Sequence, residues 1–347
     1  MTFDEYRERR RVFAEELGDP VSGLTLLRDE FDLMRISDVY HYTTITGFLS
    51  IMQKREMWAS HIAFMNDRSE YSHGKELFRR RLSQRVSGVP ETEQRFLRMV
   101  MESLEREISD GAYTTSSKDV FCLSFSYAPD SLEMWRGYGR ESGIAIGFDQ
   151  AQCSSLPGMS LIREEMYEKL LAAYDGKPEE VCPKYEHGFY PLTILYDDDL
   201  KTRVADRAIE MGLACFRNRS RIDTSAALVT ATDFLSDMMF YTIPFFKHRG
   251  FAGEEECRLV THLVRRGADA YRVRYRERSG LLLPYLKYEL MDRNCRPLKQ
   301  MPIREIVIGP GVKQARVAES VRYFLERNGM ADLVEKVRLS DIPYVAV

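Results

Sequence analysis

Short apolar runs and longer stretches with helical spacing alternate along this chain of 347 residues. Runs rich in aromatic and β-branched side chains form a first group at 38–43, 56–60, 120–125 and 143–148. A second group lies at 257–263, 271–275, 281–290, 305–308 and 334–339. Runs of this length and composition predict β-strands, gathered in two clusters.

Helical spacing marks most of the sequence between and around these runs. Ile45, Phe48 and Met52 recur at i, i+3 and i+7, which predicts an amphipathic helix directly after the first strand. A capping box at Thr2-Phe3-Asp4-Glu5 predicts a surface helix in the charged first 17 residues. Further helices are predicted on both sides of 87–90 within 69–108, after 200, after 224 and over 312–327.

Strands in two clusters with helices gathered between them predict an α+β fold rather than a doubly wound α/β sheet. The strands should join in one mixed or antiparallel sheet system. The expected organisation is an N-terminal helical extension at 1–36, a first half of the α+β core at 37–149, a mostly helical insertion at 150–240 and a second half of the core at 241–347.

Composition is ordinary for a globular chain, with 44% hydrophobic and 30% charged residues. A net charge of −3 provides no bulk attraction to nucleic acid. No apolar run reaches the roughly 18 residues that span a bilayer. Six scattered cysteines without a CxxC pair favour reduced, buried thiols and therefore a cytoplasmic protein.

Two groups of residues in the first strand cluster could carry chemistry. His41 lies in a strand between Tyr40 and Tyr42, so it points to the opposite face from both. It fits either a core histidine with one hydrogen bond or a ligand contact. The pairs Ser60-His61 and Asn66-Asp67 come next, and Asn and Asp serve equally as turn residues or as ligand contacts.

Two later groups are also candidates. Trp135, within Met134-Trp135-Arg136-Gly137-Tyr138, could stack on a planar ring or pack in the core. Three carboxylates, Glu254, Glu255 and Glu256, lead into an apolar strand. In a regular pleat Glu254 and Glu256 would share one face. Glu256 could be catalytic, or it could form a buried salt bridge with Arg258 or Lys247.

Other site classes are not supported by motif. The sequence has no GxSxG nucleophile elbow, no GxGxxG dinucleotide fingerprint and no GxxxxGK[ST] phosphate loop. His and acidic residues lack the spacing of a metal site, so no metal is expected.

The same residues resemble a bacterial family, the domain of unknown function 2971. The resemblance rests on Tyr40-His41-Tyr42, Trp58-Ala59-Ser60, Phe64-Met65-Asn66-Asp67, Phe121-Cys122-Leu123-Ser124, Met134-Trp135, Gly143-Ile144-Ala145-Ile146-Gly147-Phe148, Lys247, Glu254-Glu255-Glu256-Cys257-Arg258 and Ile306-Val307-Ile308-Gly309. The order of these blocks is similar in turn to the ADP-ribosyltransferase superfamily, including its DNA-targeting toxin branch.

That second resemblance implies an ADP-ribosyltransferase-like split-sheet core with a helical insertion, and NAD as a substrate. His41 would hold a ribose hydroxyl, Ser60 the nicotinamide side, and Glu256 would be the late catalytic glutamate. Glu254 could take the catalytic role instead, because Glu254 and Glu256 have the Glu-x-Glu spacing of arginine-modifying members.

Further contacts are expected around NAD. Aromatic rings stack on planar rings, so Tyr42 or Trp135 would lie against the nicotinamide ring. Asn66 and Asp67 directly follow the strand that contains Ser60, so they would flank the cleft that holds NAD.

The leading functional hypothesis is an NAD-consuming transferase that modifies a macromolecule, protein or nucleic acid, as a toxin or anti-phage effector. The alternatives are an NAD glycohydrolase with the same site, and a non-catalytic binding or regulatory module on the same fold. No membrane partner is expected, and self-association into a homo-oligomer is compatible with the sequence.

Overall fold

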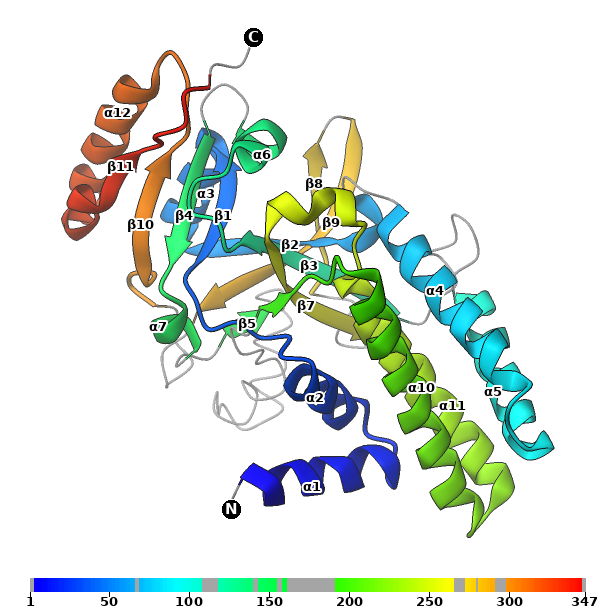
Figure 1. Ribbon diagram of the computed structural model, residues 1–347. Helices are drawn as coiled ribbons and strands as arrows, with labels where there is room; N and C mark the ends of the chain where they lie inside the picture. Colours follow the sequence, from blue (N-terminus) through cyan, green and yellow to red (C-terminus); the bar gives the residue numbers. More distant parts are fainter. Residues whose placement is uncertain are drawn as a thin grey trace. The chain divides into compact units, whose positions relative to one another are not determined.

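The computed structural model describes residues 3–65, 69–107, 118–139, 143–154, 158–160, 191–264, 272–278, 280–290 and 298–344. The chain divides into two compact units. The helical unit contains residues 1–35, 62–120 and 192–251, and the sheet unit contains residues 36–61, 121–191 and 252–347. Helices and a mixed sheet together confirm the predicted mixture of α and β structure (Figure 1).

Six α-helices account for most of the described helical unit. They are α1 (Phe3–Glu15), α2 (Pro20–Glu30), α4 (Ser69–Val86), α5 (Glu91–Glu107), α10 (Asp198–Ser220) and α11 (Thr224–Thr242). Short elements accompany them: η1 (Ile62–Phe64), β6 (Leu192–Thr193), η4 (Ile243–Phe245) and η5 (Arg249–Glu254), the last of which extends past the boundary of the unit.

Helices α10 and α11 begin at aspartate caps. The Asp197 carboxylate accepts a hydrogen bond from the Leu200 amide at 2.7 Å, and Asp223 binds the amides of Ser225 and Ala226. Each cap satisfies backbone donors that the first helical turn leaves unpaired.

The helices predicted in 69–108 pack in the helical unit, although the expected organisation assigned them to the first half of the core. The stripe of α5 that contains Phe96, Val100 and Leu104 is buried, and α5 contacts both α4 and α11. Phe96 stacks on Phe216 of α10, with 5.1 Å between ring centroids. Their apolar stripes therefore cover each other.

The sheet unit contains strands from both predicted clusters. They are β1 (Val39–Thr44), β2 (Glu56–His61), β3 (Lys118–Ser126), β4 (Gly143–Phe148), β5 (Gly158–Ser160), β7 (Glu256–Val264), β8 (Arg274–Arg278), β9 (Leu281–Leu290), β10 (Ile303–Ile308) and β11 (Val337–Leu339). Its helical elements are α3 (Ile45–Lys54), α6 (Leu132–Met134), η2 (Trp135–Gly139), α7 (Gln150–Ser154), α12 (Gln314–Arg327) and η7 (Ala331–Lys336).

The strand order is β11-β10-β4-β1-β3-β2-β9-β5, with β7 paired to β3 and β8 paired to β9. The β10–β11 pair is parallel, whereas the other ladders with a described register are antiparallel. The sheet is therefore mixed, as the sequence predicted.

A narrow junction divides the sheet into two groups of strands. Strand β1 pairs with β4 at six positions, but its described pairing with β3 is the single pair Tyr40↔Ser126. Figure 1 shows β4 and β10 side by side with opposite directions, and β2 and β3 lying across them at an angle. His41 directly follows the one described pair that joins the two groups.

One face of the sheet is apolar and carries the core of the unit. Helices α3 and α12 contribute Phe48 and Leu325 to this core, where they meet Phe125, Ile146 and other inward side chains. Glycine 147 allows close packing on the other face, because a Cβ atom there would stand 2.6 Å from the ring of Tyr40.

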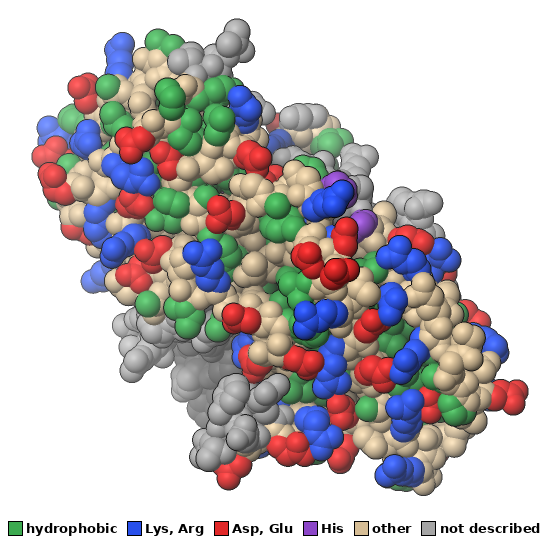
Figure 2. Space-filling model, viewed as in Figure 1, with side chains coloured by type: hydrophobic (Ala, Val, Ile, Leu, Met, Phe, Trp, Pro, Cys, Tyr) green, Lys and Arg blue, Asp and Glu red, His purple; other side chains and the backbone are tan. Residues whose placement is uncertain are grey.

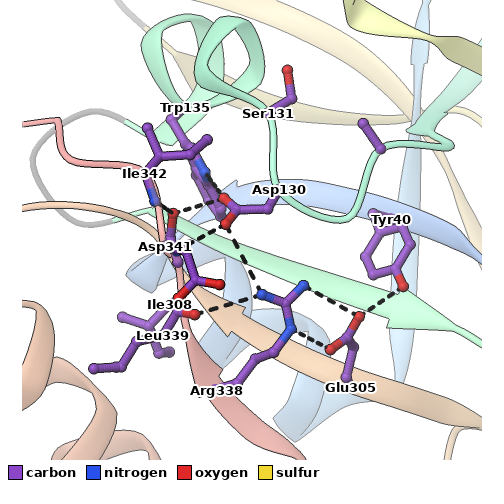
Figure 3. Close-up of polar contacts among 12 residues, drawn as sticks. Tyr40, Asp130, Ser131, Trp135, Glu305, Ile308, Arg338, Leu339, Asp341 and Ile342 are labelled. Carbon is purple, nitrogen blue, oxygen red and sulfur yellow. Dashed lines mark hydrogen bonds and ion pairs between the residues drawn. The ribbon is translucent and has the colours of Figure 1, made fainter.

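A polar network joins β1, β10 and β11 on that other face (Figure 3). The Tyr40 hydroxyl donates to Glu305 at 2.7 Å, and Arg338 donates to the same carboxylate at 2.5 Å. Arg338 also lies 4.0 Å from Asp130, which accepts from the Trp135 indole at 2.6 Å. These contacts fasten the segment before α6 to the C-terminal strand.

Acidic and basic side chains are interspersed over the face of the molecule drawn in Figure 2. This distribution agrees with a net charge of −3.

A candidate functional site on the polar face of the sheet

Alternation along β2, β3, β7 and β9 separates a core face from a polar face. The core face contains Met57, Ala59, Phe121, Leu123, Phe125, Cys257, Leu259, Leu286, Tyr288 and Leu290. Successive strand residues point to opposite faces. The opposite face, called the polar face, therefore contains Glu56, Trp58, Ser60, Ser124, Glu256, Arg258, Tyr285, Lys287 and Glu289.

Ser60 lies beside an arginine and two stacked aromatic rings on the polar face. Ser60 pairs with Tyr285 in the β2–β9 ladder. The Trp58 and Tyr285 rings stack with centroids 4.4 Å apart, and the Arg276 guanidinium lies 5.3 Å from the Trp58 ring. Arg276 donates to the Ser60 hydroxyl at 2.9 Å. The position predicted to contact NAD is thus accompanied by a cation.

Two carboxyl groups lie directly opposite each other across the same ladder. Glu56 pairs with Glu289. The Glu56 carboxylate lies 2.5 Å from the Lys287 ammonium and accepts from the Trp58 indole at 2.8 Å. Glu289 is half-buried. Burial, and then the Glu56 charge, raise the pKa of Glu289 to about 7. A carboxyl group with this pKa can exchange a proton near neutral pH.

The Glu289 environment predicts a specific dependence of stability on pH. The pKa of Glu289 is about 7 in the folded protein, above the ordinary value of 4.5. Because the folded protein favours the protonated Glu289, this group stabilises the folded state fully below the unfolded pKa of 4.5. That stabilisation is lost as pH rises through 7. Between pH 5 and pH 8 the free energy of unfolding should fall by about 1–2 kcal/mol less in Glu289→Gln than in the wild type. This magnitude allows for the partial exposure of Glu289.

Urea unfolding at both pH values measures this difference. Glu319→Gln, an exposed carboxylate on α12, serves as the control and should follow the wild type. Identical pH dependence in wild type and Glu289→Gln would show that Glu289 titrates at its ordinary value.

Glu256 lies in a buried ion pair, as one interpretation of the sequence predicted. Its carboxylate accepts from Arg258 at 2.6 Å and 2.8 Å, so both oxygens contact one guanidinium. Glu256 is 4% exposed and Arg258 is 1% exposed. This two-point contact fixes the orientation of the carboxylate.

The expected pleat through Glu254 and Glu256 is wrong. Strand β7 begins at Glu256, whereas Glu254 ends η5, and Glu255 takes the left-handed conformation with φ of 44°. The chain turns here because the Glu254 and Glu255 carbonyls accept hydrogen bonds from Ser126 and from the Tyr127 amide. Glu254 is half-buried and lies outside the strand, so it shares no strand face with Glu256.

His41 lies at the junction between the two strand groups. Its Nδ1 atom is 3.0 Å from the Ser124 carbonyl, and its ring meets Phe125 edge-on at 5.8 Å. Alternation with Val39 directs it toward the core face, opposite to Ser60. Burial first, and Arg276 in addition, lower the pKa of His41, so its imidazole is neutral at pH 7.

Tyr42 and Trp135 support the structure around the junction. The two rings are buried and meet edge-on at 4.6 Å. The Tyr42 hydroxyl donates to the Ala128 carbonyl and accepts from the Ser131 amide. Packed in this way, neither ring has an open face for nicotinamide. Asn66 and Asp67, the remaining predicted contacts, lie outside the described residues.

The structure therefore brings Ser60 and Glu256 to one face, whereas His41 points toward the opposite face. Sequence reasoning missed Arg276, Tyr285 and Glu289. The alternation of arginines through β8 and of polar residues through β9 was the available signal, but it identifies a face only when the partner strands are known.

Comparison with known proteins supports part of the predicted resemblance. A family model described as a protein of unknown function, DUF2971, matches residues 134–259, a little over a third of the chain. This segment is similar to that family and includes both Trp135 and Glu256. No curated protein and no solved structure matches the chain.

Two further observations concern the part of the chain that the structure describes. No helix there is long and apolar enough to cross a membrane. Its His, Cys, Asp and Glu side chains form no group of three or more that could hold a metal ion.

Proposed function

We propose that this protein cleaves the nicotinamide–ribose bond of NAD and transfers ADP-ribose to a macromolecule, in the manner of ADP-ribosyltransferases. The observation that carries the proposal is that Ser60 and Glu256 lie on the same face of the sheet, on two strands that both pair with β3. They come from β2 and β7, which are far apart in the sequence. Both belong to the blocks that resemble the superfamily.

The narrow junction between β1 and β3 supports a split-sheet core of the ADP-ribosyltransferase kind. The two strand groups are joined at β1 and β3 through one described residue pair, and His41 directly follows that pair. Its Nε2 atom makes no hydrogen bond with the described residues. In the proposal, this nitrogen binds a ribose hydroxyl of NAD.

The chemistry assigned to Glu256 is electrostatic. Departure of nicotinamide develops positive charge on the ribose, and a fixed carboxylate stabilises that charge more in the transition state than in the ground state. Arg258 orients the Glu256 carboxylate. Arg276 and Ser60 supply a cation and a hydroxyl for the polar parts of NAD. Asn66 and Asp67 keep their proposed contact roles, and Tyr42 and Trp135 are assigned to positioning.

A non-catalytic binding module is the second candidate. The observation that favours it is the ion pair of Glu256, because a carboxylate with both oxygens on Arg258 is already neutralised. Glu254 remains the alternative catalytic residue. An NAD glycohydrolase would use the same site, with water as the acceptor.

Incubation with NAD labelled in the adenylate group separates these functions. We expect label on a macromolecule from a cell lysate. Free labelled ADP-ribose without such transfer would indicate the glycohydrolase. Intact NAD with measurable binding would indicate the module, and intact NAD without binding would contradict the proposal. Toxin or anti-phage activity stays a prediction, which expression in a bacterial host would test.

A further inference from the structure

Strand β8 holds a row of arginines on the polar face. Arg274, Arg276 and Arg278 pair with Tyr285, Leu283 and Leu281 of β9, and these partners alternate with the buried core residues Leu286 and Leu290. The three guanidinium groups, called the arginine row below, therefore leave the same side of the sheet. Alternate residues of a strand are about 7 Å apart.

The arginine row has no carboxylate partner within the described residues. Arg276 contacts only neutral groups there, the Ser60 hydroxyl and the rings of Trp58 and Tyr285. No ion pair joins Arg274 or Arg278 to a described residue. The carboxylate of Glu277 is on the opposite face and accepts from the Gly280 amide at 2.7 Å.

Glu289 is a carboxyl group that interacts electrostatically with Arg274, but it is only partly ionised at neutral pH. Burial raises the pKa of Glu289 to about 7. In only about half of the molecules is Glu289 then ionised at pH 7. The positive charge of the arginine row is consequently not balanced by this neighbour.

Such an arrangement costs free energy in the absence of a ligand. Burial, and then repulsion from Arg278, lower the pKa of Arg276. The Nε atoms of Arg274 and Arg276 are also buried and lack a hydrogen-bond acceptor. Buried donors without acceptors typically cost about 1–3 kcal/mol each. An anion bound at the row would offset the repulsion between these cations.

We propose that Arg274, Arg276 and Arg278 bind an anion that carries two or more phosphate groups. Guanidinium groups match phosphate oxygens with paired hydrogen bonds, and several linked phosphates match several cations in a line. The diphosphate of NAD and the phosphates along a polymer share this chemistry. The proposal does not depend on cleavage of NAD, and binding measurements alone test it.

The experiment compares the wild type with an Arg274→Gln/Arg278→Gln double variant, which removes two positive charges, keeps polar side chains and leaves Arg276 on Ser60. Arg316→Gln on α12 is the matched control, because Arg316 is exposed. Calorimetry at 50 mM salt measures binding of inorganic pyrophosphate, NAD and a ten-residue oligothymidylate. Thermal melting checks folding, and loss of like-charge repulsion should not lower the melting temperature.

We expect the wild type and Arg316→Gln to bind pyrophosphate equally within about twofold. The double variant should lose at least about tenfold in affinity, since two charge-assisted contacts are removed. For the oligonucleotide, the salt dependence should weaken: the negative slope of log affinity against log salt should become shallower by about 1.5 in the double variant. Equal pyrophosphate binding by a folded double variant, or no binding by the wild type, overturns the proposal.

The other two ligands identify the source of the phosphates. Loss of NAD binding in the double variant would place the NAD diphosphate on the arginine row. A loss confined to the oligonucleotide and pyrophosphate would indicate a phosphate polymer. A wild type that binds pyrophosphate but not NAD would contradict the proposed NAD-cleaving function and would still support anion binding at the arginine row.

Discussion

Replacing Arg258 with methionine is expected to lower the free energy of unfolding by about 3–5 kcal/mol. Arg258 contacts both oxygens of Glu256, and both side chains are buried in β7. Removal of the cation leaves an ionised carboxylate in a poorly solvated position, which costs more than the pair itself gains. Urea unfolding at pH 7 measures the change.

Two variants make this result interpretable. Arg316→Met removes an exposed arginine and should change stability by less than about 0.5 kcal/mol. Glu256→Gln/Arg258→Met removes both charges and should recover part of the loss. If Arg258→Met costs under 1 kcal/mol, the pair contributes little and Glu256 is solvated in solution.

The second large effect concerns catalysis. Glu256→Gln is expected to reduce kcat for nicotinamide release by about a hundredfold or more, while NAD affinity changes by less than about threefold. An interaction made chiefly in the transition state has this signature. Release of nicotinamide and calorimetric NAD binding are measured on the same preparation. His41→Ala should weaken NAD binding as well, because the proposed ribose contact exists in the ground state.

Glutamine at position 256 also perturbs the ion pair, so folding must be checked by thermal melting. Glu256→Asp keeps the charge and provides a second variant if Glu256→Gln is unstable. Glu254→Gln is the matched control, being half-buried and two residues away, and should retain activity. An inactive Glu254→Gln beside an active Glu256→Gln would transfer the catalytic role to Glu254.

Much of the secondary structure could be predicted because its causes are local. Strand β4 is buried along its whole length and reads as a continuous apolar run. Helix α3 begins at the Thr44 cap and presents Phe48, Ile51 and Met52 to the core. Periodicity also identified β9, from Leu281 to Leu290. Both the apolar pattern and the helix cap are visible in a few neighbouring residues.

The grouping of these elements was less predictable. Helices α4 and α5 pack with α10 and α11, although long stretches of sequence separate them. An apolar stripe shows that a helix is covered on one side, but it does not specify which partner covers it. The predicted division of the chain therefore differs from the two units observed.

The sequence by itself determined a mixed α and β protein, the positions of most strands, and the residues Ser60 and Glu256 as candidates. Tertiary structure alone decided that Glu255 turns the chain, that Arg258 holds Glu256, and that β8 carries a row of arginines without carboxylate partners. The physical reason is that charge and conformation at a site depend on neighbours brought together by pairing between distant strands. Residue type and local spacing do not contain that information.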